Sequence, residues 1–595
     1  MNDELLDCQS ETDVARVWLR ALLQQTGNKL ALVFDNLETL QDPATGRITD
    51  DAVAAWLDAC KPGSDPAPVV LVTSRWAISD WEGDRRVQRP LGKPLYGDFL
   101  RYHQQRGGAP WGVERLRRLY EALDGNFKGL EFFHGLSQVA GDDEAFLQQL
   151  EHSKKKLQLH MMVEKLVGYL QPDERELLNR LRAYLAPTFA DGVRVIAQGL
   201  TDPERLLRRL VGLSLVDMEM EVTLRLPRYR LSAVVADWLQ AHDPEPASDI
   251  RQSAARHQHW IHDYLLRTLD QALIAHEALR QSGLDDEAAR FALGNIIPYF
   301  ELTGLYHMLL KDWLPALRES QDRTLRAWAL NDSGKTCIRV GQYDEARSYL
   351  EESQTIYQTL GDRAGEGVVL NNLARIYYVR GDSATALCYL EESLAIQRVI
   401  GDRAAEGRTL NNLSQIYDTR GDFATALRYL EESLTIQQAI GSRAGEGAVL
   451  NNLSALCHAR GDYDTALRYL EKSLALRRAI GDRAGEGVTL NNLSQIYQAR
   501  GDYDTALRYL EESLVIIRAI GDRAGLCQTL FSMGYIYLEK GERQQLVPCF
   551  VEAYRIAKEI SLAEALMNLE NLAKQLGGDG LEDWERLSQQ MASGE

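Results

Sequence analysis

The chain has 595 residues, of which 45% are hydrophobic and 26% are charged, an ordinary globular composition. At roughly 150 residues per domain, this length predicts several domains with sizeable cores. The 67 basic and 86 acidic side chains give a net charge of −19, which disfavours general nucleic-acid binding. The sequence shows neither an apolar run that could span a membrane nor a basic leader, so we expect a cytoplasmic protein without a membrane anchor.

Two short apolar runs near the N-terminus have the pattern of strands buried in a parallel sheet. The first follows a predicted amphipathic helix over residues 11–26 and runs over residues 29–38, with Asp35 and Asn36 near its end. The second covers residues 69–75 and ends in Arg75. Ligands of open α/β sheets bind at the carboxyl ends of such strands, so these polar residues are candidates for a binding site.

The two runs resemble the core of the signal-transduction ATPases with numerous domains (STAND), an NB-ARC-like class. The resemblance implies that Asp35 coordinates magnesium from a Walker B strand and that Arg75 senses the terminal phosphate of a nucleotide. It also implies that residues 123–130 are the class's glycine-x-proline segment and that residues 160–245 form its winged-helix domain. In that class these pieces precede a repeat sensor, as they do here.

Three nucleotide contacts of the class are missing from the sequence. No G-x-x-x-x-G-K-[ST] loop is present, and the residues before the first strand are too few to hold one. Phe127 replaces the adenine-contacting proline, and Ser232-Ala233 replaces the His-Asp pair of the winged helix. We therefore expect no bound cofactor, with ATP or ADP plus magnesium as the alternative. The residues that would remain from a nucleotide site are Asp35, Asn36 and Arg75.

Two explanations of the missing loop stay open: the chain starts downstream of a complete ATPase core, or the module has decayed into a scaffold. Residues 246–320 predict further helices that connect this half to the C-terminal half of the chain.

From residue 321 the sequence repeats at a period of 40, with copies that begin at 321, 361, 401, 441, 481 and 521. Apolar residues at spacings of three and four mark two amphipathic helices in each copy. Pairs such as Gly481-Asp482 and Gly501-Asp502 separate the helices, because glycine can end one helix and aspartate can cap the next. Each copy is thus predicted to be a helical hairpin that stacks on its neighbours in one solenoid.

The repeat resembles a tetratricopeptide repeat (TPR), in the 40-residue form of kinesin light chain and of cell-polarity scaffold proteins. Leu490, Leu493 and Tyr497 match the packing positions of the first helix, and Ala506 and Leu510 match those of the second. The resemblance implies that the first helices line a concave groove in which asparagines hydrogen-bond the backbone of a bound peptide. The matching groove residues are Asn331, Lys335, Asn371, Arg375, Asn411, Gln415, Asp418, Asn451, His458, Asn491, Gln495, Gln498, Phe531 and Tyr535.

Four copies carry two consecutive asparagines, such as Asn411 and Asn412. An amide donates and accepts at once, so it can pair with a peptide N–H and C=O together. We predict that the first asparagine of each pair contacts the partner, while the alternative, that one of the two only bridges adjacent hairpins, stays open. Cations at the start of the array and aromatic residues at its end predict a partner with acidic residues at one end and an apolar anchor at the other.

The chain is therefore expected to be mainly α, a TPR solenoid preceded by a truncated α/β P-loop-NTPase-like core and a winged-helix domain. The expected domains are a partial core without Walker A (1–110), a small helical domain (111–158), a winged-helix-like domain (159–245), a helical connector and cap (246–320), six repeats (321–560) and a C-terminal capping helix with a tail (561–595).

We predict a protein-interaction scaffold that binds a protein or peptide in the TPR groove and performs no catalysis, since no metal-ligand cluster or nucleophile motif occurs. The main alternative is a nucleotide-switched STAND ATPase. A third is a DNA-binding regulator that uses arginines of the winged helix, namely Arg180, Arg182, Arg205, Arg208 and Arg209. Homo-oligomerisation stays open.

Overall fold

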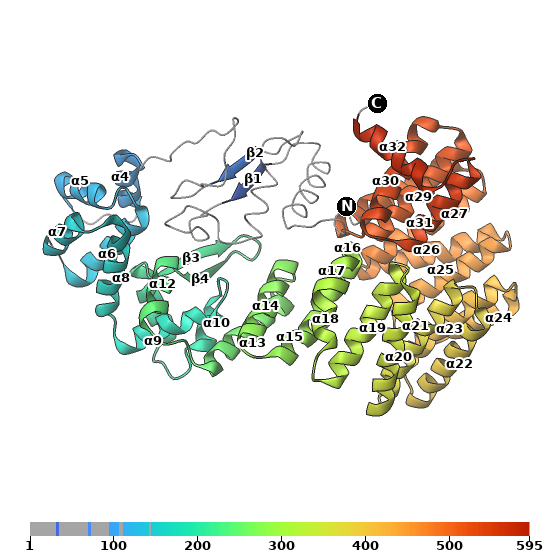
Figure 1. Cartoon of the computed structure of the whole chain (residues 1–595), viewed down its shortest axis with the longest axis horizontal. Helices are drawn as coiled ribbons and strands as arrows, with labels where there is room; N and C mark the ends of the chain where they lie inside the picture. The colour runs from blue at the N-terminus through green and yellow to red at the C-terminus, as the bar shows by residue number, and fades with distance from the viewer. Residues whose placement is uncertain (1–30, 35–68, 73–93, 106–110, 142–143, 594–595) are drawn as a thin grey trace. The chain divides into compact units, whose positions relative to one another are not determined.

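The computed structural model describes residues 31–34, 69–72, 94–105, 111–141 and 144–593. They belong to two compact units, Val87–Ile296 on the one hand and Met1–Arg86 with Ile297–Glu595 on the other, and each is described by itself. The structure is mainly α-helical (Figure 1). Within the described ranges, no helix has the length and apolar character needed to cross a lipid bilayer.

The two apolar runs near the N-terminus form strands β1 (Ala31–Phe34) and β2 (Val69–Val72), which pair in parallel with Ala31 opposite Val69. All eight residues of the pair are apolar, as predicted for parallel strands. The residues assigned to a remnant nucleotide site lie outside the described residues; they are Asp35, Asn36 and Arg75.

Five helices open the Val87–Ile296 unit. They are α4 (Tyr96–Gln105), α5 (Val113–Ala122), α6 (Phe127–Ala140), α7 (Glu144–His152) and α8 (Lys155–Gly168). Asn126 caps α6 by accepting a hydrogen bond of 2.9 Å from the Gly129 N–H, which explains why the helix begins after it. The core that these helices share includes the fully buried Phe99, Leu130 and Phe132.

Four helices and a hairpin follow in the segment for which a winged helix was predicted. They are α9 (Pro172–Arg180), α10 (Ala190–Ile196), α11 (Pro203–Gly212), β3 (Val216–Glu221), β4 (Leu226–Leu231) and the closing helix α12 (Ala233–His242). The strands are antiparallel, with Val216 opposite Leu231. Arginines of the DNA-binding alternative are engaged inside the unit; Arg180, for example, contacts Glu176 at 2.6 Å, and Arg182 contacts Glu245 at 2.8 Å.

The boundary between the two units lies after Ile296, within the segment predicted as a single connector. Before it lie α13 (Ser248–Tyr264), α14 (Leu269–Gln281), α15 (Asp285–Phe291) and a π-helical stretch, Ala292–Ile296. After it lie α16 (Ile297–Thr303), α17 (Tyr306–Met308), a π-helical stretch Leu309–Trp313, and α18 (Leu314–Arg318).

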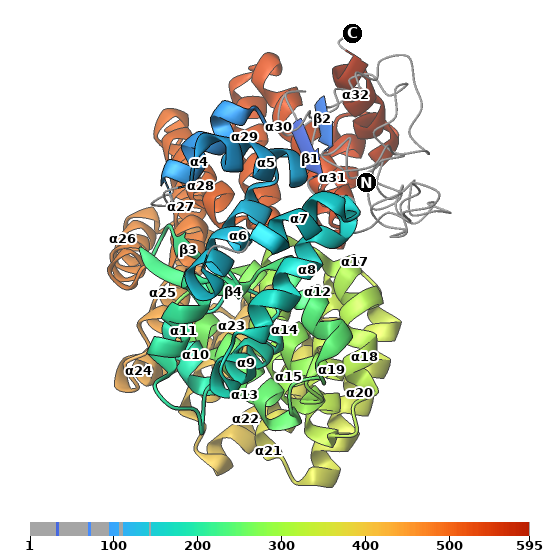
Figure 2. The same ribbon diagram turned by 90° about the vertical axis from the view of Figure 1, so that its left-hand side faces the viewer.

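The repeats form six antiparallel helical hairpins, followed by two further helices (Figures 1 and 2). The first helices are α19 (Arg323–Arg339), α21 (Arg363–Val379), α23 (Arg403–Thr419), α25 (Arg443–Ala459), α27 (Arg483–Ala499) and α29 (Arg523–Lys540). The second helices are α20 (Tyr343–Leu360), α22 (Ser383–Ile400), α24 (Phe423–Ala439), α26 (Tyr463–Ile480), α28 (Tyr503–Ile520) and α30 (Arg543–Glu559). The array ends with α31 (Ala563–Gln575) and α32 (Leu581–Ser593).

The Gly-Asp turns work as the sequence predicted. Gly381, between α21 and α22, has a φ of +82°, in the left-handed region that glycine enters without strain. Asp382 then accepts a hydrogen bond of 3.0 Å from the Thr385 N–H and caps α22. The same pairing recurs before α24, α26 and α28, capped by Asp422, Asp462 and Asp502. In the first and sixth copies Gln342 and Glu542 stand after the glycine and make no side-chain cap bond to the described residues.

Small residues let the two helices of a hairpin approach closely. Ala506, Leu510 and Ser513 of α28 are all fully buried. The Ser513 hydroxyl donates to the carbonyl of Gly487 in α27 at 3.0 Å, and a side chain at Gly487 would lie 2.9 Å from Ile517. The hairpins are therefore held by close packing together with a buried hydrogen bond.

Candidate partner-binding surface of the repeat array

One face of the first helices is exposed or half-buried along most of the array, although Ser532 of the last copy is buried. The eighth, twelfth, fifteenth and nineteenth residues of each copy share this face, because they follow the 3.6-residue period of a helix. We call it the first-helix stripe: residues 328, 332, 335 and 339 of the first copy and their equivalents in the other five. At its eighth positions Trp328, Val368 and Val488 are 46%, 41% and 49% exposed. At its fifteenth positions Gln415 and Gln495 are exposed.

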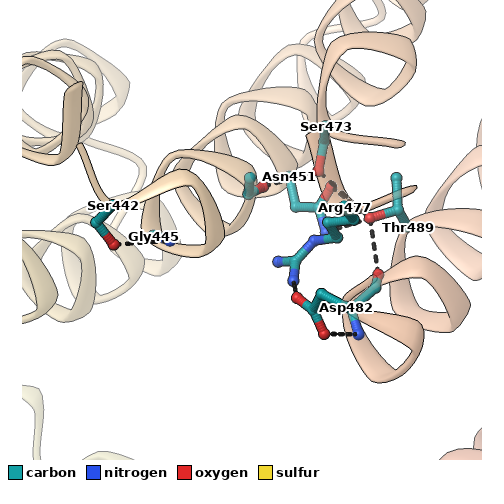
Figure 3. Close-up of polar contacts among 9 residues, drawn as sticks. Ser442, Gly445, Asn451, Ser473, Arg477, Asp482 and Thr489 are labelled. Atoms are coloured by element: carbon teal, nitrogen blue, oxygen red, sulfur yellow. Dashed lines mark hydrogen bonds and ion pairs between the residues drawn. The ribbon is translucent and has the colours of Figure 1, made fainter. Parts of the chain in front are cut away.

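The first asparagine of each pair lies beside the stripe and is bonded inside the array. Asn451 is 5% exposed, and its Nδ2 donates to the Thr489 hydroxyl of the next copy at 3.1 Å (Figure 3). Asn491 is 6% exposed and donates to Ser513 at 3.2 Å and to Thr529 at 2.9 Å. These residues join neighbouring copies through buried hydrogen bonds. Their counterparts Asn331, Asn371 and Asn411 are half-buried.

The second asparagine lies on the stripe, and in three of the four pairs it donates back to the first asparagine of the preceding copy; among the described residues, Asn492 makes no such bond. The bonds run from Asn372 to Asn331 at 2.8 Å, from Asn412 to Asn371 at 3.0 Å and from Asn452 to Asn411 at 2.7 Å. In the part of the chain that the structure describes, no hydrogen bond engages the Oδ1 of Asn372, Asn412 or Asn452. Each of these three is thus held by its amino group and presents an unused acceptor. Its place on the stripe follows from helical spacing, three residues before Arg375, Gln415 and Ala455.

The last of these asparagine–asparagine bonds runs from Asn452 to Asn411. At the next interface between copies Asn451 Oδ1 accepts from the Thr489 hydroxyl at 3.3 Å, and in the last copy Phe531-Ser532 replaces the asparagine pair. Asn491 Oδ1 is buried and, among the described residues, has no hydrogen-bond partner. In the first three copies, this Oδ1 accepts a hydrogen bond from the second asparagine of the following copy. Ser532 occupies the position of that second asparagine in the copy that follows Asn491. A buried acceptor without a donor is unfavourable, so this copy interface lacks a contact that others have.

The two predicted cations near the start of the array are partly buried. Lys335 Nζ lies 3.1 Å from Glu301 Oε1 of α16 and 3.1 Å from Asp332 Oδ1. Burial opposes the charge of Lys335, but the two carboxylates outweigh it and raise its pKa. Burial and the neighbouring Arg339 lower the pKa of Arg375. Lys335 is therefore already paired, whereas Arg375 lacks full compensation of its charge.

The three predicted polar residues in the middle of the array are half-buried. Burial raises the pKa of Asp418 and lowers the pKa of His458. The His458 ring lies 5.6 Å from the ring of Tyr463, and Gln498 donates to Glu539 of α29 at 3.1 Å.

The predicted apolar anchor site contains an aromatic cluster. The rings of Phe531 and Tyr535 are 5.0 Å apart, and they lie 5.5 Å and 5.8 Å from the ring of Phe550 in α30. Phe550 is fully buried, while the other two are half-buried, and burial raises the pKa of Tyr535. The rings of Phe531 and Tyr535 are therefore partly buried in the core of the last repeat.

Buried glutamates at the sixth position of several copies hold neighbouring hairpins together. Glu406 is 2% exposed; Arg398 of the preceding hairpin contacts it at 2.9 Å, and Arg403 also pairs with it. Glu486 makes the equivalent contacts with Arg478 and Arg483, at 2.8 and 2.6 Å. These glutamates were not predicted, although a recurring Arg-Ala-x-Glu-Gly segment with arginine or glutamine eight residues before the glutamate marks them.

Among the described residues, no group of three or more histidine, cysteine, aspartate or glutamate side chains is placed to hold a metal ion.

A tetratricopeptide-repeat family model matches residues 325–398, 389–439, 406–479, 445–519 and 487–559. Residues 325–559 are therefore tetratricopeptide repeats, which confirms the sequence prediction. No curated protein matches the chain.

Among solved structures, the chain is similar to a signal-transduction ATPase with numerous domains that carries a tetratricopeptide-repeat sensor, from Pyrococcus horikoshii. The identity is 16%, the match covers 98% of this chain and 82% of that chain, and the TM-score is 0.57. This likeness supports the expected fold, a TPR array preceded by a STAND-like half. Shorter matches are BtubC from P. vanneervenii (22% identity, 37% and 92% coverage, TM-score 0.31) and a putative kinesin light chain from Podosopora anserina (23%, 33% and 97%, 0.28).

Proposed function

We propose that this chain is a protein-interaction scaffold whose tetratricopeptide repeats bind a peptide segment of a partner protein along the first-helix stripe. Tetratricopeptide repeats over residues 325–559 support a protein-interaction role. Stacked repeats offer a continuous surface that a single hairpin lacks, so one partner segment can contact several copies.

The observation that carries the proposal is the set of unused amide acceptors on the stripe. Asn372, Asn412 and Asn452 recur at 40-residue intervals, and each is oriented by its bond to the preceding copy. Each Oδ1 can accept a hydrogen bond from a peptide N–H without first breaking a bond inside the array. Orientation in advance lowers the entropic cost of binding, so the first asparagines act as positioning residues for the second.

Apolar side chains beside the amides supply contact area. Val368 and Val488 are exposed on the same stripe, as is Trp328 in the first copy. Burial of such side chains against a partner contributes affinity, while the amides fix the direction of the bound backbone. The middle of the stripe carries few charges, since positions fifteen and nineteen are Gln415, Thr419, Ala455, Ala459, Gln495 and Ala499.

The test compares two double variants of the full chain. Peptides from a displayed library are selected on the immobilised protein, and their affinity is measured by fluorescence polarisation. Asn412→Ala with Asn452→Ala should weaken the selected peptides roughly tenfold, as two lost hydrogen bonds would, and should change the melting temperature little. Asn411→Ala with Asn451→Ala should lower the melting temperature, since these amides bridge copies.

Equal peptide affinity for the wild type and the Asn412/Asn452 variant, with both proteins folded, would contradict the proposal.

For the N-terminal half we propose a regulatory or docking role without resident nucleotide, with a nucleotide-switched ATPase as the second candidate. Fold-level similarity to a STAND protein over 98% of the chain keeps both under consideration. The two are separated by denaturing purified protein, assaying for released ADP or ATP, and titrating untreated protein with a fluorescent nucleotide and magnesium. Binding that Asp35→Ala abolishes would favour the switch; no binding at millimolar nucleotide would favour the scaffold.

A further inference from the structure

The two ends of the repeat array touch each other. A Cβ placed on Gly304, directly after α16, would lie 2.8 Å from Cγ2 of Ile560, which follows α30. A Cβ on Gly341, in the turn of the first repeat, would lie 2.8 Å from the Cβ of Ala563 in α31. The helix α16 packs against α29, near which it lies in Figure 1. The array therefore closes on itself through the segment that leads into it and through its first turn.

The segment that makes this closure, residues 297–308, is called the strap. Its Tyr306 is 3% exposed and belongs to the hydrophobic cluster of the last repeat, together with Cys527 and Ile560. Phe531 and Tyr535, the predicted apolar anchor site, pack against this same cluster. The strap thus contributes an apolar side chain to the end of the array where the partner's apolar anchor was predicted to bind.

The strap also pairs with Lys335, a cation that was predicted to contact the partner. Glu301 of α16 lies 3.1 Å from Lys335 on the first-helix stripe. Arg375, the next cation along the stripe, feels the charge of Glu564 at the start of α31. The chain's own glutamates therefore stand where acidic residues of a partner would stand.

We propose that the strap is an intramolecular occupant of one end of the partner-binding surface, and that a partner segment with a carboxylate and an apolar anchor displaces it. This inference rests on the proposed function. The strap carries the same two features, Glu301 and Tyr306, on one short stretch of chain. Because it is tethered, its effective concentration at the site is high, on the order of millimolar for a short connection, so a free ligand must compete with it.

A matched pair of glycine substitutions tests the closure. Gly341 and Gly381 occupy the same turn in successive repeats, with φ of +81° and +82°, so backbone strain from a side chain is alike at both. Only Gly341 has a neighbour, Ala563, within contact distance; nothing lies within 4 Å of a Cβ at Gly381. Gly341→Leu should therefore push the ends apart, while Gly381→Leu serves as the control.

Hydrogen exchange of the strap amides is the first measurement. We expect exchange in residues 297–308 to be roughly tenfold faster in Gly341→Leu than in Gly381→Leu. Equal exchange in the two variants would overturn the closure. Should Gly341→Leu fail to fold, Tyr306→Ala replaces it and Tyr306→Phe becomes its control, since phenylalanine keeps the ring that fills the cluster.

Competition by the strap sequence is the second measurement. The probe is a fluorescein-labelled peptide of residues 297–308, together with its Glu301→Gln version. The probe should bind the full-length Gly341→Leu variant roughly tenfold tighter than it binds the wild type. The Glu301→Gln probe should lose most of that gain in affinity. The same affinity for both proteins, or for both probes, would overturn the proposed occupancy.

Failure of this inference is distinguishable from failure of the proposed function. Suppose that library peptides depend on Asn412 and Asn452 but bind the wild type and Gly341→Leu equally. This result would contradict occupancy of the surface by the strap and would support the proposed scaffold function. The opposite result is faster hydrogen exchange in the strap and tighter binding of the strap probe, with no effect of the asparagine variants on the affinity of library peptides. It would support occupancy by the strap and contradict peptide binding through the second asparagines.

Discussion

Asn452 donates a hydrogen bond from its Nδ2 to the Oδ1 of Asn411, 2.7 Å away, across the boundary between two copies of the repeat. Equivalent bonds join Asn372 to Asn331 and Asn412 to Asn371. Each bond fixes the rotation of one hairpin against the next, because the two side chains belong to first helices of neighbouring copies. The ladder therefore couples the geometry of the array to the orientation of the amides on its accessible face.

A hydrogen-bond donor for the Oδ1 of Asn491 should stabilise the array. Ser532→Asn places a donor where Asn491 Oδ1 is buried without a partner among the described residues. One added hydrogen bond is expected to raise the free energy of unfolding by about 1 kcal/mol, measured by urea denaturation. In an Asn491→Ala background the same substitution should bring no gain. A gain of equal size there would show that the effect does not come from a hydrogen bond to Asn491.

Removing the Thr489 hydroxyl should loosen one interface between copies. This hydroxyl accepts a hydrogen bond from Asn451 Nδ2, lies 3.3 Å from the Ser473 hydroxyl and donates to the Gly485 carbonyl (Figure 3). Thr489→Val keeps the shape and leaves a buried amide with fewer partners. We expect a loss of about 1–3 kcal/mol in the free energy of unfolding.

Thr435→Val is the matched control, since the Thr435 hydroxyl donates only within its own helix, to Glu431. It should change the free energy of unfolding by less than about 0.5 kcal/mol. Comparable losses in the two variants would mean that the inter-copy hydrogen bonds contribute little.

Glu406→Ala should destabilise the array more than loss of a surface charge does. Glu406 is 2% exposed and is shared by Arg398 and Arg403, whose side chains are about half exposed and can regain water. We expect a loss of about 1–2 kcal/mol, less than for a fully buried pair. Glu432→Ala, which removes the more exposed partner of Arg398, should have nearly no effect in the same urea titration.

The capping aspartates should make stability depend on acid pH. Hydrogen bonds from the hydroxyl and the backbone N–H of Thr385 lower the pKa of Asp382, and Thr425 and Thr465 do the same for Asp422 and Asp462. A folded pKa below the unfolded value, which is about 3.9, adds stability above that value. This stability is lost as the pH falls through the folded pKa.

A variant with all three aspartates replaced by asparagine tests this dependence. Its urea midpoint should fall less than that of the wild type between neutral pH and about pH 3, because asparagine caps without titrating. Parallel curves for the two proteins would show that these carboxylates do not contribute to acid unfolding.

Much of the repeat architecture was predictable because each copy carries its own signals. The 40-residue period, the apolar spacing and pairs such as Gly381-Asp382 specify where helices begin and end without reference to distant residues. The strand pair β1–β2 was predictable for a similar reason, since its apolar runs are continuous.

The roles of the two asparagines could not be separated from sequence. Asn451 and Asn452 differ by one helical step, about 100° around the axis, and which of them faces the next copy depends on how the hairpins rotate against each other. The three-dimensional packing is needed to show that Asn451 bonds to Thr489 of the next copy and that Asn452 bonds back to Asn411. The closure was equally hidden, because it arises from small rotations summed over six repeats.

Contact between the first turn, at Gly341, and the helix that begins at Ala563 leaves this repeat array without a loose end. In an open solenoid the terminal repeats touch one neighbour each and fray first. Here, local unfolding at either end of the array also removes contacts from the opposite end. Fraying therefore costs more free energy, and the array should unfold in a single cooperative transition. The backbone should accordingly tolerate a cut in a middle turn, such as Gly421-Asp422, better than removal of the residues that join its ends.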